Sequence, residues 1–267
     1  MIRTLHIDTG REMQGGQWQV RYLVERLENA TLLGRFDHSF TLSRLAAEAR
    51  QADLVHAHDA RAHTLAAAIK GAPLVVSRRV AFPVSTSIPS RWKYTRADLF
   101  LAVSDFVAWK LREAGVPDKK IRVVYDGIPI PPQSTPEPGR IIAVPSKFKD
   151  IGIPVHLTAN LFDDLRTASV FLYMSEMEGL GSAAIAAMAA GVPVVASGVG
   201  GLPEVVEHER TGLLVRDGDY AGAVRRLLDN PSLAAELGAA GREKAIAKFP
   251  VEKMVESTLA AYNEILR

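Results

Sequence analysis

The chain has 267 residues, of which 48% are hydrophobic and 23% are charged, and its formal net charge of +2 is the difference between 32 basic and 30 acidic side chains. This balance gives no bulk electrostatic reason to expect nucleic acid as a partner, and the absence of cysteine excludes disulfides, thiolate nucleophiles and thiolate metal ligands. No apolar run reaches the roughly 18 to 20 residues that cross a bilayer, and the chain starts like a strand rather than a cleavable leader, so we expect a cytoplasmic protein.

Short β-rich runs alternate with helical patterns through the first half of the chain. The expected strands are residues 2–8, 52–58, 72–77, 98–104 and 121–127, and the expected helices are 18–30 and 62–71. This alternation is typical of βα units on a parallel sheet, so the sequence predicts the α/β fold class.

A proline-rich linker follows residue 128. Its sequence, PIPPQSTPEPGR, holds five prolines and shows no apolar periodicity, which is typical of an extended connection. We therefore expect an N-terminal Rossmann-like domain over residues 1–133 and a C-terminal Rossmann-like domain over 134–253.

The strand and helix alternation resumes after the linker. The expected strands are residues 140–146, 169–175, 192–197 and 211–215, and the expected helices are 181–191, 203–209, 220–229, 231–249 and 251–267. Doubly wound sheets bind ligands at the carboxyl ends of their strands, so the turns that follow these strands are the places to look for a site.

Two glycine-rich turns stand out between residues 175 and 215. Gly179 and Gly181 allow a tight turn that a ligand can approach closely. Further along, Gly200 and Gly201 precede a helix start at Leu202, where unpaired N–H groups can hold anions. Either turn alone also suits an ordinary βα connection, but together they predict a pyrophosphate site.

These motifs resemble those of a known family. The EG-x-G turn, the helix ending AMAAG, the strand PVVAS, the loop GVGGLPEVV and the closing TGLLV look like the retaining nucleotide-sugar glycosyltransferases of family 4, the glycosyl transferases group 1. Supporting matches are ADLVHAHDARAH and KYTRADLFLAVSDFVAWKLREAGVPDKKIRVVYDGI. The resemblance implies an unusually short member with the GT-B fold, in which two Rossmann-like domains face a cleft. It also implies that a C-terminal helix, residues 254–267, crosses toward the N-terminal domain.

The resemblance further implies roles for individual residues. Glu178 matches the glutamate that contacts hydroxyls of the donor sugar, and Lys149 matches the lysine that neutralises the leaving diphosphate. His58 is expected beside the acceptor, so these three are the expected catalytic residues. The expected residues for the donor nucleotide sugar are Gly15, Gly16, Lys147, Gly179, Gly181, Gly200, Gly201 and Leu202.

The chain departs from the family pattern in several places. Ala186 stands where a second glutamate would hold the ribose hydroxyls, and its small neighbours favour a closely packed helix instead. The segment 143–175 is much shorter than its equivalent. The arginine that normally precedes the lysine at position 149 by a few residues is also missing, and Lys147 could substitute for it. Where relatives carry a histidine, Arg78 and Arg79 are candidates for binding a phosphate or an anionic acceptor, or else structural arginines.

Histidines and paired aspartates are possible metal ligands, but the sequence does not favour a metal-binding site. We expect His56 and His58 to point to opposite faces of their strand, so that only one faces the cleft and joint ligation is disfavoured. Asp163 and Asp164 suit a helix start, where acids complement the dipole. No G-x-S-x-G elbow indicates a serine hydrolase. We therefore expect neither a metal nor a cofactor.

The sequence predicts a retaining glycosyltransferase of the hexosyl type. It would move a sugar from a UDP-, GDP- or ADP-linked donor to a glycan or lipid-linked acceptor. Any membrane contact is expected to be peripheral, at the inner membrane surface. The alternative is a catalytically degenerate GT-B-like protein that binds nucleotide, sugar or a partner without turnover. Ala186 and the short segment 143–175 favour that alternative.

Overall fold

The computed structural model describes residues 2–35, 38–69, 71–85, 87–145 and 148–267. The chain divides into two compact units: unit 1 comprises residues 1–126 and 251–267, and unit 2 comprises residues 127–250. The sequence analysis places the corresponding limits at residues 133 and 253.

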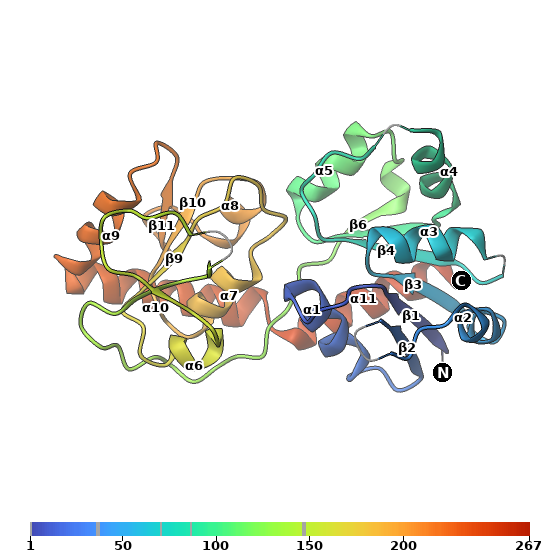
Figure 1. The fold of residues 1–267 in the computed structure, drawn as a ribbon, viewed down its shortest axis with the longest axis horizontal. Coiled ribbons are helices and arrows are strands. Elements are labelled where there is room, and N and C mark those ends of the chain that lie inside the picture. Colours follow the sequence, from blue (N-terminus) through green and yellow to red (C-terminus); the bar gives the residue numbers. More distant parts are fainter. Residues whose placement is uncertain (1, 36–37, 70, 86, 146–147) are drawn as a thin grey trace. The chain divides into compact units, whose positions relative to one another are not determined.

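Unit 1 is built on a six-stranded sheet in the order β2-β1-β3-β4-β5-β6, with every pair parallel (Figure 1). Its strands are β1 (Thr4–Asp8), β2 (Ala30–Gly34), β3 (Leu54–Ala57), β4 (Leu74–Arg78), β5 (Leu99–Ala102) and β6 (Ile121–Val123). Because the strands are parallel, their carboxyl ends lie along one edge of the sheet. The residues that follow β1, β3 and β4 are therefore neighbours.

Helices connect these strands. They are α1 (Gly15–Val24), α2 (Leu42–Ala49), α3 (Ala60–Ala68), α4 (Ile88–Arg96) and α5 (Asp105–Glu113), and a 3-10 turn, η1 (Asp118–Lys120), precedes β6. Side-chain caps start three of them, and the cap of α2 is Thr41, which accepts from the N–H of Arg44. The side chain of Asp59 accepts hydrogen bonds from the first N–H groups of α3, and that of Ser104 does the same for α5. These caps explain why the chain enters a helix directly after β3 and soon after β5.

The C-terminal helix α11 (Val251–Ile265) belongs to unit 1. Met254, Val255 and Tyr262 on this helix share one hydrophobic core with Leu54 of β3 and Val75 of β4. Tyr262 has no exposed surface. The last residues of the chain therefore complete the core of the sheet formed by the first ones.

Unit 2 is built on a five-stranded parallel sheet in the order β11-β10-β9-β7-β8. Its strands are β7 (Ile141–Ala143), β8 (His156–Leu157), β9 (Val170–Tyr173), β10 (Val194–Ser197) and β11 (Leu213–Val215). Its helices are α6 (Leu161–Leu165), α7 (Ser182–Ala189), α8 (Leu202–Val205), α9 (Tyr220–Leu228) and α10 (Pro231–Lys248). Between β7 and β9 the described residues form β8 and α6, which is the short segment noted in the sequence.

Two parallel sheets with connecting helices confirm the α/β fold class. The elements β2, β8, α2, α4 and α5 are additions to those predicted from sequence, and α8 ends at Val205, short of the predicted 203–209. The helix α4 buries none of its side chains and β8 is exposed, so neither carries the apolar periodicity that marks an element.

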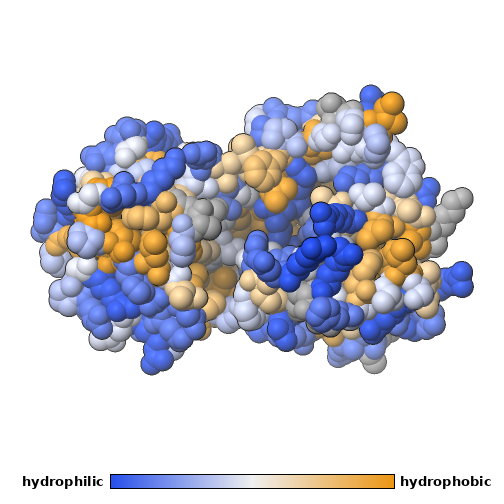
Figure 2. Space-filling model, viewed as in Figure 1, coloured by the Kyte–Doolittle hydropathy of each residue, from blue (hydrophilic) through white to orange (hydrophobic). Residues whose placement is uncertain are grey.

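The surface is mixed in character. Seen from one side, hydrophilic residues cover much of each unit and hydrophobic residues gather in separate patches (Figure 2). Four large hydrophobic side chains on and just before α4 are at least 44% exposed: Val80, Phe82, Ile88 and Trp92. None of the helices in the described part of the chain combines the length and the hydropathy needed to span a membrane.

Candidate active site

Glu178 lies in the turn after β9, and both oxygens of its carboxylate accept hydrogen bonds. The hydroxyl of Tyr173 donates to Oε2 at 2.7 Å, and the backbone N–H of Gly179 donates to Oε1 at 3.1 Å. Burial, and then the carboxylate of Glu178, raise the pKa of Tyr173, so the phenol stays protonated and donates. The sequence analysis missed Tyr173, because an aromatic residue ending a strand signals only core packing.

The turn after β9 is tied to the loop after β10. The backbone N–H of Gly201 donates to the carbonyl oxygen of Glu178 at 3.0 Å. A Cβ at Gly200 would overlap that same carbonyl oxygen, and a Cβ at Gly201 would overlap the carbonyl oxygen of Gly179. The glycines of one loop are therefore required by the backbone of the other, and the two sequence motifs form one structural unit.

Gly181 closes the turn at the start of α7. Its φ of +104° lies in the left-handed region, and a Cβ there would approach Cδ2 of Leu202 to 2.6 Å. Leu202 itself is fully buried. The turn is thus held by backbone contacts at one end and by a buried leucine at the other.

Ala186 stands where the family pattern has a glutamate, and its side chain is 1% exposed. It lies on α7, where all side chains from Ala184 to Ala189 are buried. The helix α10 packs closely on α7, since a Cβ at Gly238 would overlap the carbonyl oxygen of Gly191 just beyond it. Position 186 therefore belongs to a tightly packed interior.

Lys149 lies in the loop after β7 and pairs with Glu176, which follows the neighbouring strand β9. The two side chains are 2.7 Å apart and are 69% and 85% exposed. Their hydrogen bond raises the pKa of Lys149 and lowers the pKa of Glu176, so both are charged at neutral pH. The fold thus brings this lysine to the strand edge that carries Glu178. Lys147, the other expected cation, lies outside the described residues.

Gly15 and Gly16 are the first residues of α1. Among the described residues, no atom lies within 4 Å of a Cβ placed at either position, so packing there does not require glycine. The preceding loop is organised by Asp8 at the end of β1, whose Oδ1 accepts from the N–H of Gly10 at 2.8 Å and from the side-chain amide of Gln17 at 3.2 Å. Burial raises the pKa of Asp8.

His56 and His58 lie on the same side of the sheet, with ring centroids 3.9 Å apart. The prediction that they point to opposite faces is wrong, because residues two apart in a strand share a face. His56 bonds the hydroxyl of Tyr262 through Nδ1 at 2.6 Å and that of Ser77 through Nε2 at 2.8 Å. The buried histidine therefore links α11 to β3 and β4.

His58 connects a second set of buried groups. Its Nε2 lies 3.0 Å from Nδ1 of His6, and Nε2 of His6 lies 3.0 Å from Oγ1 of Thr4. On its other side, Nδ1 of His58 lies 3.3 Å from Nη1 of Arg79, whose Nε donates to Asp126 at 2.9 Å. Burial, with the charge of Arg79 adding to it, lowers the pKa of His6 to about 3, and burial lowers the pKa of His58 well below its ordinary value.

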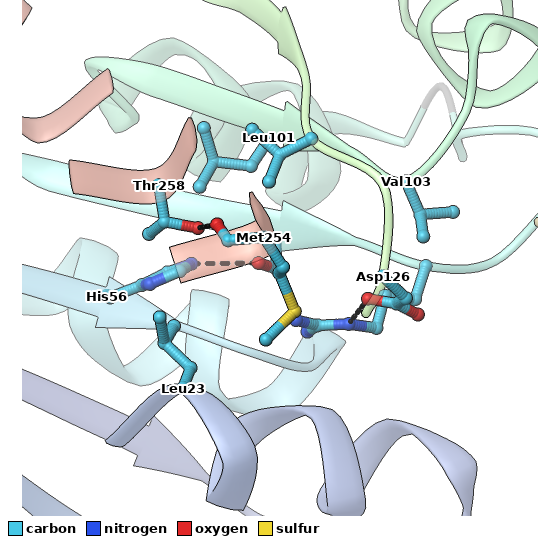
Figure 3. A pocket seen from close by; sticks show the side chains of 10 residues that line it. Leu23, His56, Leu101, Val103, Asp126, Met254 and Thr258 are labelled. Atoms are coloured by element: carbon cyan, nitrogen blue, oxygen red, sulfur yellow. Dashed lines mark hydrogen bonds and ion pairs between the residues drawn. The ribbon is translucent and has the colours of Figure 1, made fainter. Parts of the chain in front are cut away.

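A small cavity of about 10 Å³ adjoins this network in unit 1. Figure 3 shows His56, Asp126, Met254 and Thr258 around it. A cavity of this size holds about one water molecule, so it has no room for a sugar.

Arg78 has different hydrogen-bond partners from those of Arg79. Nη1 of Arg78 donates to the hydroxyl of Tyr94 at 2.8 Å, and Nη2 donates to the carbonyl oxygen of Phe82. Nε of Arg78 is buried and has no hydrogen-bond partner among the described residues. Arg78 therefore braces the loop that leads to α4.

The spacing of His6, His56 and His58 would suit a metal ion, because their ligand atoms lie within 4.8 Å of one another. Both nitrogens of His56 are used by hydroxyl groups, however, and Arg79 places a positive charge beside His58. Hydrogen bonding and charge therefore both disfavour a cation here.

Asp163 and Asp164 lie in the first turn of α6, which confirms their placement at a helix start. Asp164 accepts from the hydroxyl of Thr158 at 2.7 Å and from Arg140 at 2.7 Å. These contacts are structural, and they hold α6 against the strand edge.

Two family models match most of the chain. The model described as Glycosyl transferases group 1 matches residues 158–244, and the model described as Glycosyltransferase Family 4 matches residues 8–130.

Among curated relatives, the alpha-maltose-1-phosphate synthase of Mycolicibacterium smegmatis is 39% identical over 122 residues, which is 42% of this chain and 31% of the relative. The N-acetyl-alpha-D-glucosaminyl L-malate synthase of Bacillus anthracis is 35% identical over 111 residues, which is 40% of this chain and 29% of the relative. The chain thus spans about a third of the length of the curated relatives it matches.

Among solved structures, Anabaena HepE in complex with UDP superposes with a TM-score of 0.84 at 16% identity, covering 98% of this chain and 100% of that one. A complex of the same protein with UDP-glucose matches equally well. At this identity the likeness concerns the fold.

Proposed function

The chain belongs to glycosyltransferase family 4 and has the GT-B fold of two Rossmann-like domains, and we propose that it transfers a hexosyl group from a nucleotide-diphosphate donor to an acceptor with retention of configuration. The observation that carries this proposal is the joined pair of loops in unit 2. There the carboxylate of Glu178 is fixed by Tyr173 and Gly179, and the backbone N–H of Gly201 donates to the backbone carbonyl oxygen of Glu178.

Each residue has a part in the proposed reaction. The fixed carboxylate of Glu178 accepts hydrogen bonds from hydroxyls of the donor sugar and so orients its anomeric carbon. The bond from that carbon to the diphosphate breaks as an acceptor hydroxyl attacks from the same face, and the hydroxyl proton leaves with the diphosphate. Lys149 stabilises the charge that develops on this leaving group, which requires it to exchange its partner Glu176 for the phosphate.

Glycine residues complete the proposed donor site. Gly179, Gly181, Gly200, Gly201 and the backbone of Leu202 allow close approach to the sugar and diphosphate in unit 2. Within unit 1, considered by itself, Gly15 and Gly16 are proposed as a separate ligand-facing backbone, since a Cβ at either position would lie in open space among the described residues. We propose UDP as the nucleotide, because HepE binds it with the same fold, and keep GDP and ADP as alternatives.

The acceptor is proposed to bind at the carboxyl edge of the unit 1 sheet near His58 and Arg79. A glycan or a lipid-linked glycan would both suit a cytoplasmic enzyme with peripheral membrane contact. Phe82, Ile88 and Trp92 support such contact, since they are exposed and α4 contains no acidic residue.

The second candidate function is binding of a nucleotide or sugar without turnover. The buried Ala186 favours it, since it removes the position that would hold the ribose. The short stretch between β7 and β9 favours it as well, since little structure remains there to surround a base.

Calorimetric titration with UDP, GDP and ADP, followed by a donor-hydrolysis assay, separates the two candidates. Binding of one nucleotide together with release of free nucleotide from its sugar conjugate supports the transferase. Binding with no release supports the binding protein. Binding of none of the three nucleotides would overturn both.

A further inference from the structure

Unit 1 buries an unusually polar cluster at the carboxyl edge of its sheet. His6, His56 and His58 are 0%, 0% and 7% exposed, and they adjoin the pair of Arg79 and Asp126. Apolar side chains at such positions are often at least as stabilising as a buried ion pair. Stability alone therefore does not account for the cluster, and a function has to be sought.

The hydrogen bonds of the cluster run in one direction. A guanidinium has no acceptor, so Nη1 of Arg79 donates and Nδ1 of His58 accepts. A neutral imidazole carries its proton on the other nitrogen, so Nε2 of His58 donates to Nδ1 of His6. Nε2 of His6 then donates to Oγ1 of Thr4. The arginine thus fixes the tautomers of both histidines.

The same contacts fix the guanidinium of Arg79. Nε is held by Asp126 and Nη1 by His58. The hydrogen bonds of this guanidinium to described residues come from Nε and Nη1, not from Nη2. The Arg79 side chain is 15% exposed and lines the small cavity, so part of it remains accessible. Arg78 differs, because its two Nη atoms are both engaged.

We propose that Arg79 recognises a phosphate or carboxylate group on the acceptor, and that His58, His6 and Asp126 are positioning residues that hold its guanidinium. This inference rests on the proposed transferase function and names its acceptor class as anionic. The Nη2 edge donates to the anion. Because Nε and Nη1 are fixed, binding requires little further loss of side-chain freedom. The adjoining cavity holds only about one water molecule, so the anion lies outside it.

The test uses the full chain labelled with ¹⁵N-histidine, and the ring nitrogens are followed by NMR at neutral pH. The wild type should show His6 and His58 as Nε2–H tautomers. Inorganic phosphate and, in a separate arm, acetate should shift Nδ1 of His58, and the arm with the stronger response identifies the anionic group. In Arg79→Met the phosphate response should weaken on the order of ten- to a hundredfold, and the two histidines should populate both tautomers.

Arg61→Met, which removes an exposed arginine of α3, is the matched control and should leave both readouts unchanged. Arg79→Lys keeps a charged donor and should retain the tautomers if Arg79→Met fails to fold. A proton on Nδ1 of His58 in the wild type, or a phosphate response that survives Arg79→Met, would overturn the proposal. A UDP titration of the same samples tests the donor site of unit 2 separately, so failure of the transferase function is distinguishable.

Discussion

The backbone N–H of Gly201 donates to the carbonyl oxygen of Glu178 at 3.0 Å, so the loop after β10 fixes the turn that presents the candidate catalytic carboxylate. This close approach of the two backbones depends on the absence of a side chain at Gly200. We expect Gly200→Ala to destabilise the fold by more than the roughly 1 kcal/mol of its positive φ, because the new Cβ overlaps the carbonyl oxygen of Glu178. Urea unfolding measures this.

The matched control for that change is Gly152→Ala. Gly152 has a φ of +69°, close to the +58° of Gly200, but a Cβ there meets nothing within 4 Å. The difference between the two variants isolates the overlap with Glu178. Equal losses of stability would show that the two loops do not need this close approach.

Tyr173→Phe should slow donor turnover about tenfold with little change in stability. It removes the hydroxyl that holds Oε2 of Glu178, and one hydrogen bond of roughly 1.4 kcal/mol corresponds to that factor. Steady-state kinetics should show the loss in kcat more than in KM if the bond orients the sugar for reaction. Tyr22→Phe in unit 1 serves as the control, and an equal loss of turnover in both variants would remove the role given to Tyr173.

Ala186→Glu should lower the unfolding free energy by about 3 kcal/mol or more, because it buries a charge without a partner. Nucleotide affinity should not increase. Ala183→Glu provides the control on the same helix, since Ala183 is only partly buried and should tolerate the change. A stable Ala186→Glu protein that binds nucleotide more tightly would instead reveal a surviving ribose site.

Acid should destabilise unit 1 through its histidines. Folding lowers the pKa of His6 from 6.5 to about 3, so between these values the unfolded chain binds a proton that the native state excludes. Above pH 6.5, His6 therefore does not lower the free energy of unfolding. As the pH falls from 6.5 toward 3, the free energy of unfolding decreases, by roughly 2 kcal/mol at pH 5 from His6 alone. His56 and His58, whose pKa values are also lowered by burial, act in the same direction.

Urea unfolding at pH 8, 6.5 and 5 checks this dependence, with His6→Gln and the exposed His156→Gln as a pair. His6→Gln should flatten the loss of stability on acidification, and His156→Gln should retain it. A wild-type stability that is constant down to pH 5 would contradict buried neutral histidines.

The sequence predicts those elements whose signal is local. The predicted strands around β3, β4 and β9 are strands in the structure, because continuous apolar residues between polar turns mark interior strands. The helix α4 and the two-residue β8 lack buried side chains and gave no such signal.

Contacts between distant residues lay beyond sequence reasoning. The hydrogen bond between His56 and Tyr262 joins residues 206 positions apart. The pairing of Arg79 with Asp126 joins the segments that follow β4 and β6, which are separated by β5 in the sheet. Glu178 and the glycine loops can be proposed from the sequence because each is a local motif. Tyr173, which holds Glu178, was missed because its role arises only when β9 and the following turn are folded together.

The most direct test of the proposed sugar transfer is a proton NMR time course of UDP-glucose with the wild type, Glu178→Gln and the exposed-site control Glu243→Gln. We expect the wild type and the control to release UDP, with the first-formed sugar product keeping the anomeric configuration of the donor, and Glu178→Gln to lose most of this activity. UDP-glucose that binds but stays intact, or release that is unchanged in Glu178→Gln, would contradict a transferase site built on the Glu178 turn.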